Sequence, residues 1–247
     1  MNGYSRGFFG TPTVVKNIIY INVIMFLASL AADQVYHIDL TRVLGIYFVK
    51  SDQFHPYQLL THMFMHGSLT HILFNMLGLF FLGQFLEQVW GPKRFLIYYL
   101  ITGFGAILIN ESVLAFQYYR IMSHISPDIV QEVLDNGFRY TLEHKAYVDP
   151  LAGELQSLLY TPTVGASGAI FGVLLAIGVL FPNMQIMIFP LPIPIKAKFF
   201  VAGYAAVELV LAVSQPGSSI AHAAHLGGMI FGYILIRYWR KTTKTLY

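Results

Sequence analysis

The stretch GASGAIFGVLLAIGVLF, residues 165–181, indicates most directly how this chain folds. Apart from Ser167 near its start, every residue in it is apolar or glycine. Such a run predicts a helix, and its 17 residues, at a rise of about 1.5 Å each, reach only about 25 Å. Because the hydrocarbon core of a bilayer is about 30 Å thick, we expect this helix to lie in a membrane with its start recessed below the surface.

The composition extends this interpretation to the whole chain. Of the 247 residues, 56% are hydrophobic and 11% are charged, whereas an ordinary soluble domain has about 25% charged residues. We therefore predict an all-α, multi-pass membrane bundle of six spans with a short, central fourth helix. The six apolar stretches lie at about 13–32, 69–89, 94–114, 165–181, 197–213 and 222–240. The chain has no cysteine, which excludes disulfides and a cysteine nucleophile.

Basic residues flank the spans and do not form one patch, which favours a role in membrane orientation over a nucleic-acid partner. With the N-terminus in the cytoplasm, ten of the fifteen fall in inner segments: Arg6, Lys16, Lys93, Arg94, Lys196, Lys198, Arg237, Arg240, Lys241 and Lys244. The outer segments hold the other five: Arg42, Lys50, Arg120, Arg139 and Lys145. We therefore expect both termini to be cytoplasmic. The first span, with small residues at 28–32, also fits a cleavable signal peptide, although its apolar run is longer than a usual signal core.

Two outer segments, 33–68 and 115–164, are too long to be simple turns. In the first we predict a short helix from Pro56 to His66 that lies at the membrane interface. The second is interpreted as a small extracytoplasmic insertion between the third and fourth spans. We expect two helices in it, because an N-cap residue precedes a proline at Ser126-Pro127 and at Asp149-Pro150.

Ser167 is the first candidate for chemistry, because polar groups at membrane depth are unfavourable and are usually functional. In the first turn of its helix, unpaired backbone N–H groups and the positive end of the helix dipole can stabilise an oxyanion. The flanking glycines, Gly165 and Gly168, allow another backbone to approach closely.

A histidine, His225, occupies the matching place at the start of the sixth span. Small residues form a similar helix face after each polar residue: Gly228 and Gly232 after His225, and Gly168 and Gly172 after Ser167. If these two faces pack together, Ser167 and His225 come to a similar depth. The imidazole can then act as a general base on the hydroxyl.

The second span supplies two hydrogen-bond donors near its outer end. His71 and Asn75 are four residues apart and therefore share a helix face. On the topology above, all three polar sites begin an even-numbered span and converge in the outer third of the membrane. The alternative for His71 and Asn75 is that they hydrogen-bond neighbouring helices and only hold the bundle together.

Three motifs together resemble those of the rhomboid intramembrane serine proteases. They are G-x-S-G at 165–168, A-H-x-x-G-x-x-x-G at 224–232 and H-x-x-x-N at 71–75. The resemblance covers about 60–110 and 165–240 and implies a single rhomboid membrane domain over 1–247. It implies a serine endopeptidase of a bacterial cell (inner) membrane that cleaves single-span membrane proteins near the outer membrane face. Neither a cofactor nor a metal is implied, and the oligomeric state stays open.

The resemblance also implies a role for each matching residue. Ser167 would be the nucleophile, and His225 would be the base and later the acid. The oxyanion hole would consist of His71, Asn75 and the backbone N–H of Ser167. Further matches are expected to line or support the cavity: His66, Gly165, Gly168, Phe171 and Gly228. Phe171 departs from the tyrosine that packs on the catalytic imidazole in many members, but phenylalanine can still stack; the family's Trp-Arg pair is missing from the first outer loop.

The remaining polar residues have other interpretations. His62 and His66 could ligate a metal, but no carboxylate accompanies them and the H-E-x-x-H pattern is absent, so we expect no metal site. Glu208, inside the fifth span, is interpreted as an interior packing or gating group, and His222 as an interfacial histidine. The rival class is an inactive rhomboid-like protein or a small transporter. Inactive relatives typically lose the serine or the histidine, and we find no pseudo-symmetric halves typical of a transporter.

Overall fold

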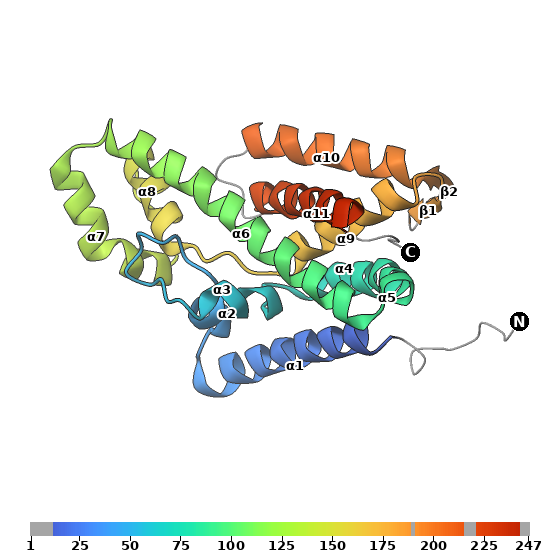
Figure 1. The fold of residues 1–247 in the computed structure, drawn as a ribbon. Helices are drawn as coiled ribbons and strands as arrows, with labels where there is room; N and C mark the ends of the chain where they lie inside the picture. The colour runs from blue at the N-terminus through green and yellow to red at the C-terminus, as the bar shows by residue number, and fades with distance from the viewer. Residues whose placement is uncertain (1–11, 189–190, 215–220, 243–247) are drawn as a thin grey trace, which may run out of the picture.

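The computed structural model describes residues 12–188, 191–214 and 221–242, and it is mostly helical (Figure 1). In chain order the α-helices are α1 (Thr13–Tyr36), α2 (Leu40–Leu44), α3 (Gln58–Thr61), α4 (Leu69–Gly78), α5 (Gln84–Trp90), α6 (Pro92–Met122), α7 (Pro127–Leu142), α8 (Pro150–Tyr160), α9 (Ser167–Leu180), α10 (Ala197–Ser214) and α11 (His222–Thr242). A 3₁₀ turn, η2 (His62–Phe64), follows α3, and a π-helical turn, η3 (Leu79–Gly83), joins α4 to α5. The basic residues Arg6 and Lys244, used above for orientation, lie outside the described residues.

Four helical segments in the described chain are long and apolar enough to cross a membrane: Thr13–Tyr36, Leu69–Trp90, Pro92–Met122 and Ala197–Ser214. The predicted fourth span is the shorter apolar helix α9, with 14 residues. The predicted sixth span is α11, with 21 residues, which has histidines in its first turn and Arg240 and Lys241 in its last. These polar ends shorten its apolar section. The all-α membrane class is therefore confirmed, and the number of six spans stays a prediction.

The bundle is built around α6, α9 and α11, which pack together through small residues (Figure 1). A Cβ atom added to Gly228 of α11 would lie only 1.9 Å from the carbonyl oxygen of Gly168 in α9. A Cβ at Gly168 would lie 2.4 Å from the Cβ of Ala106 in α6. Only glycine permits these separations, so the predicted packing of the two glycine faces is confirmed. A buried hydrogen bond, 2.8 Å from the Tyr98 hydroxyl to the carbonyl of Gly172, joins α6 to α9 one turn further on.

A buried carboxylate holds the start of α1. Pro12 precedes this helix and makes no side-chain cap. The two oxygens of Glu87, in α5, instead accept hydrogen bonds from the backbone N–H groups of Val14 and Val15, at 3.0 and 2.8 Å. A negative charge at a helix N-terminus satisfies donors that have no partner inside the helix and interacts favourably with the helix dipole. Glu87 therefore joins the first helix to the rest of the bundle.

The segment 115–164 contains the two predicted helices, α7 and α8. Asp149 caps α8 as expected, accepting from the N–H of Ala152 at 2.9 Å, whereas the Ser126 side chain makes no cap bond to α7. Buried Val133 and Leu155 pack these helices onto Ile121 of α6. The helix of the predicted third span is longer than the apolar stretch 94–114, because α6 continues to Met122. Residues 115–122 contain neither glycine nor proline, so nothing in them stops the helix.

The segment 33–68 is more irregular than predicted. The expected helix from Pro56 to His66 is a single turn, α3, followed by η2. A second short helix, α2, is capped by Asp39, whose carboxylate accepts from the N–H of Thr41 at 2.8 Å. Two backbone hydrogen bonds between Ile46 and Thr163, of 2.9 and 2.7 Å, then tie this segment to the residues just before α9. This tie holds the approach to Ser167 in place.

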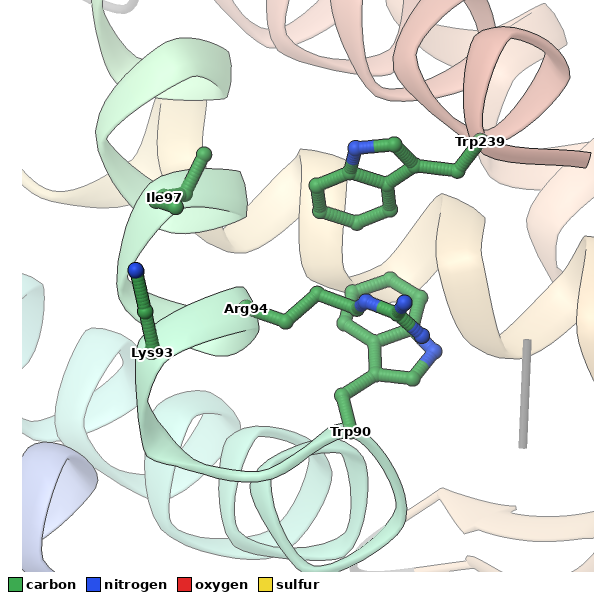
Figure 2. A pocket seen from close by; sticks show the side chains of 5 residues that line it. All are labelled: Trp90, Lys93, Arg94, Ile97 and Trp239. Atoms are coloured by element: carbon green, nitrogen blue, oxygen red, sulfur yellow. The ribbon is translucent and has the colours of Figure 1, made fainter. Parts of the chain in front are cut away.

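An antiparallel hairpin, β1 (Gln185–Ile188) and β2 (Leu191–Lys196), joins α9 to α10 and is absent from the sequence prediction. An aromatic cluster lies where α5 meets α6 and α11 ends (Figure 2). There the rings of Trp90 and Trp239 meet edge to face with centroids 5.4 Å apart, and the Arg94 guanidinium lies 5.3 Å from the Trp239 centroid. Tryptophan beside a cation is typical of a membrane–water interface.

Candidate active site

Ser167 is the first residue of α9, and the turn before it is built on Gly165. Gly165 has a φ of 126°, a backbone conformation that residues other than glycine rarely adopt. Its N–H donates to the carbonyl of His62 at 2.9 Å, and an added Cβ would lie 2.8 Å from the ring of His71. The turn therefore requires glycine twice over. It places the serine among the N–H groups at the start of α9, which have no acceptor within the helix.

The structure brings Ser167 and His225 into contact, as the glycine faces predict. Nε2 of His225, in the first turn of α11, lies 2.8 Å from Oγ of Ser167. This is a normal hydrogen-bond distance, and a neutral imidazole without a proton on Nε2 accepts from the hydroxyl. The two residues are 58 positions apart in sequence. Their contact therefore depends on the packing of α9 against α11.

Phe171, one turn after Ser167 on α9, fixes the plane of the imidazole. Its ring is stacked on that of His225, with centroids 4.1 Å apart and planes 5° from parallel. The other side of Phe171 meets Tyr204 of α10, with a centroid distance of 4.9 Å. The expectation that phenylalanine can stack where many rhomboids have tyrosine is therefore confirmed.

His71 and Asn75 lie on α4 at the same cavity as Ser167 and His225. The cavity has a volume of about 1100 Å³ and is lined by described residues of α4, α6, α8, α9, α10 and α11. Ser68 caps α4 by accepting from the N–H of His71 at 3.1 Å. Asn75 donates one amide proton to the carbonyl of His71 at 3.0 Å, which leaves its second proton available.

His66, expected to line or support this cavity, is not among the residues that line it. It is buried behind His71, and the two rings meet edge to face with centroids 4.9 Å apart. Burial, together with the neighbouring His71, lowers the pKa of His66 to about 4, so its ring is neutral at pH 7. His66 therefore supports the His71 ring from behind. His62 is also buried, with Nδ1 placed 2.8 Å from the carbonyl of Gln58.

Glu208 and His222 form a part of the site that sequence reasoning missed. The Glu208 carboxylate is buried as expected, but it lies against two histidines of α11. Its Oε2 atom is 2.7 Å from Nδ1 of His222 and 3.0 Å from Nδ1 of His225. The interfacial interpretation of His222 did not include this contact, and the side chain is buried too. An ionisable residue inside a span, and a histidine three residues before His225, were the signals that could have predicted this contact.

Glu208, His222 and His225 are also residue types that bind metals, and their ligand atoms all lie within 4.8 Å of one another. Ligands at about 2.0–2.1 Å around a tetrahedral zinc are separated from each other by about 3.3 Å. The separations of 2.7 and 3.0 Å found here are shorter, and the first is a hydrogen bond between His222 and Glu208. The geometry therefore fits a hydrogen-bonded network better than a metal centre.

Comparison with known proteins identifies the family of this chain. A family model described as Rhomboid domain matches residues 53–242. The chain is 28% identical to Rhomboid protease AarA of Providencia stuartii over 176 residues, which are 70% of this chain and 52% of that protein. It is 29% identical to the RHOMBOID-like protein 12, mitochondrial, of Arabidopsis thaliana over 182 residues, 72% of this chain and 44% of the relative. The chain thus spans about half the length of these curated relatives.

Proposed function

Because this chain belongs to the rhomboid family, we propose that it is an active serine endopeptidase of the membrane, with Ser167 as nucleophile and His225 as base. The observation that carries the proposal is the 2.8 Å contact between Oγ and Nε2 at the start of two membrane helices. Rhomboids are usually intramembrane proteases, although some relatives are inactive. Both residues needed for covalent catalysis are present here and in contact, which favours the active class.

In the proposed reaction, Nε2 of His225 takes the proton of Ser167 as Oγ attacks the carbonyl carbon of the scissile peptide bond. The negative charge that develops on the carbonyl oxygen is stabilised by the N–H of Ser167, by His71 and by the free amide proton of Asn75. The intermediate collapses when His225 returns its proton to the leaving amine. Water, deprotonated by the same imidazole, then hydrolyses the ester on Ser167 and restores the hydroxyl.

The substrate we propose is a single-span membrane protein whose helix unwinds locally near its outer end. A cavity of about 1100 Å³ is large enough for a short extended segment and contains mainly apolar walls around the polar site. We further propose six spans in a bacterial cell (inner) membrane, in which α9 and α11 complete the four segments that are long and apolar enough to cross it. The basic flanks support termini on the inner side and the segment 115–164 on the outer side.

Three variants test the catalytic pair: Ser167→Ala, His225→Ala and the double variant. Removal of either residue closes the covalent route, so all three should be almost equally inactive on a model transmembrane substrate. All three should still fold and bind that substrate. A fluorophosphonate probe should modify wild-type Ser167 and fail on both single variants. Retained cleavage by Ser167→Ala, or labelling of another serine, would return the chain to the non-enzymatic class.

A further inference from the structure

Glu208 is the one charged side chain that the described part of α10 buries; the helix otherwise buries only Ala197 and Val201. A carboxylate away from water is strongly unfavourable unless it is paired and hydrogen-bonded. Glu208 has partners on α11, the helix that carries His225. Its position therefore needs an explanation that packing of an apolar, lipid-facing helix does not provide.

The contacts form an ordered series from α10 to α9. Oε2 of Glu208 is 3.0 Å from Nδ1 of His225, and the opposite nitrogen, Nε2, is 2.8 Å from Oγ of Ser167. Each ring nitrogen of His225 thus faces one functional group. His222 Nδ1 lies 2.7 Å from the same carboxylate oxygen and holds it in place. Oε2 of Glu208 is close to Nδ1 of His225 but poorly aligned with the direction of an N–H bond at that atom. Nδ1 of His225 accordingly makes no well-directed hydrogen bond to the described residues.

We propose that Glu208 is a positioning residue that holds His225 with its proton on Nδ1, so that Nε2 is free to accept the proton of Ser167. The inference rests on the proposed function above. When the proton passes from Oγ to Nε2, the imidazole becomes positively charged and the carboxylate beside Nδ1 stabilises it. Glu208 stays ionised throughout and takes no proton.

A second contact from α10 supports this role. Tyr204 and Glu208 are four residues apart and therefore share a helix face. Tyr204 packs on Phe171, which in turn is stacked on the ring of His225. One face of α10 thus controls the imidazole both through its plane and through its Nδ1 edge. This arrangement explains why α10 has a buried carboxylate one helical turn after Tyr204.

Glu208→Gln is the decisive variant, because glutamine keeps the size and one acceptor oxygen, loses the charge and replaces the other oxygen by an NH2 donor. Loss of the orienting carboxylate from a soluble serine-protease triad lowers kcat by about 10⁴. Because the approach here is poorly aligned, we expect a fall of about 10- to 100-fold in kcat with little change in KM. Glu208→Asp should recover part of that loss. The matched control is Glu111→Gln on α6, whose carboxylate accepts from the N–H of Val49 at 3.0 Å, away from the serine; its kcat should equal the wild type.

The tautomer of His225 provides a readout that does not depend on proteolysis. In protein labelled with ¹⁵N at histidine, in the inactive Ser167→Ala background, His225 should carry its proton on Nδ1. Adding Glu208→Gln should shift the proton toward Nε2. If wild-type protein failed to cleave any substrate, the proposed function would fail, and this measurement would still decide the role of Glu208.

Three results would overturn the inference, and the first and the third of them would leave the proposed function intact. The first is wild-type kcat in Glu208→Gln, which would reduce the carboxylate to a packing group. The second is loss of activity on treatment with a chelator and recovery on addition of Zn²⁺, which would make Glu208, His222 and His225 a metal site. The third is an Nδ1 proton that persists in Ser167→Ala/Glu208→Gln.

Discussion

Replacing Gly228 by alanine should separate the two catalytic candidates without altering either of them. The new Cβ would lie 1.9 Å from the carbonyl oxygen of Gly168, whereas ordinary contact begins at 3.4 Å. At this level α9 and α11 must therefore move apart by about 1.5 Å. Because Oγ and Nε2 are 2.8 Å apart in the native packing, the same displacement takes them beyond hydrogen-bond range.

We expect turnover of a transmembrane substrate to fall about 100-fold in Gly228→Ala, since a misplacement of about 1 Å is enough for such a loss. Overpacking of this kind also destabilises a protein by about 1–3 kcal/mol, which a thermal unfolding scan in detergent would detect. The matched control is Gly203→Ala on α10, where an added Cβ has no neighbour within 4 Å. Wild-type turnover by Gly228→Ala, at the wild-type melting temperature, would refute the close packing described here.

Three further predictions address the oxyanion donors, the first helix and the topology. His71→Ala and Asn75→Ala should each lower kcat by a hundredfold or more, because one lost donor removes about 2.7–4 kcal/mol of transition-state stabilisation; normal kcat in both would make them helix contacts only. Glu87→Ala leaves two N–H groups of α1 without acceptors and should lower stability by about 1–3 kcal/mol in a thermal melt, with Glu87→Gln intermediate; an unchanged melting temperature would contradict this. In intact cells, an impermeant maleimide should label Gln131→Cys and not Lys241→Cys, and the opposite pattern would invert the topology.

The helices could be predicted where the apolar runs are long. They could also be predicted where a proline follows a residue type that favours the N-cap position, as at α7 and α8. The ends of the helices were less predictable. For example, α6 extends to Met122 because residues 115–122 carry no signal that stops the helix. The five-residue helix α2 is too short to show a helical period. The hairpin Gln185–Lys196 was missed for a similar reason, because two short strands among apolar helices leave no distinct alternation.

The contact of Ser167 with His225 was predictable because each residue is followed by glycines at helical spacing, so depth and facing direction were both encoded locally. The position of Glu208 was predictable only in part. Its depth in the fifth span could be read from the sequence, but its facing direction could not, since residues 199–213 are otherwise apolar or glycine apart from Tyr204 and define no inner face. Only the tertiary packing shows that the carboxylate points at α11. For the same reason His222 was assigned to the interface.

The membrane setting gives a physical reason for a carboxylate behind His225. In the proposed reaction, proton transfer from Ser167 produces an imidazolium and an oxyanion within a membrane bundle, where separated charges are less stable than in water. Donors at the start of α9 and on α4 act on the oxyanion. The imidazolium needs a fixed opposite charge, and Glu208, with Oε2 at 3.0 Å from Nδ1, is the acidic group placed to provide it among the described residues. Before the reaction, Nδ1 of His222 already lies 2.7 Å from the same carboxylate oxygen, so Glu208 is in place and little reorganisation is needed when the proton moves.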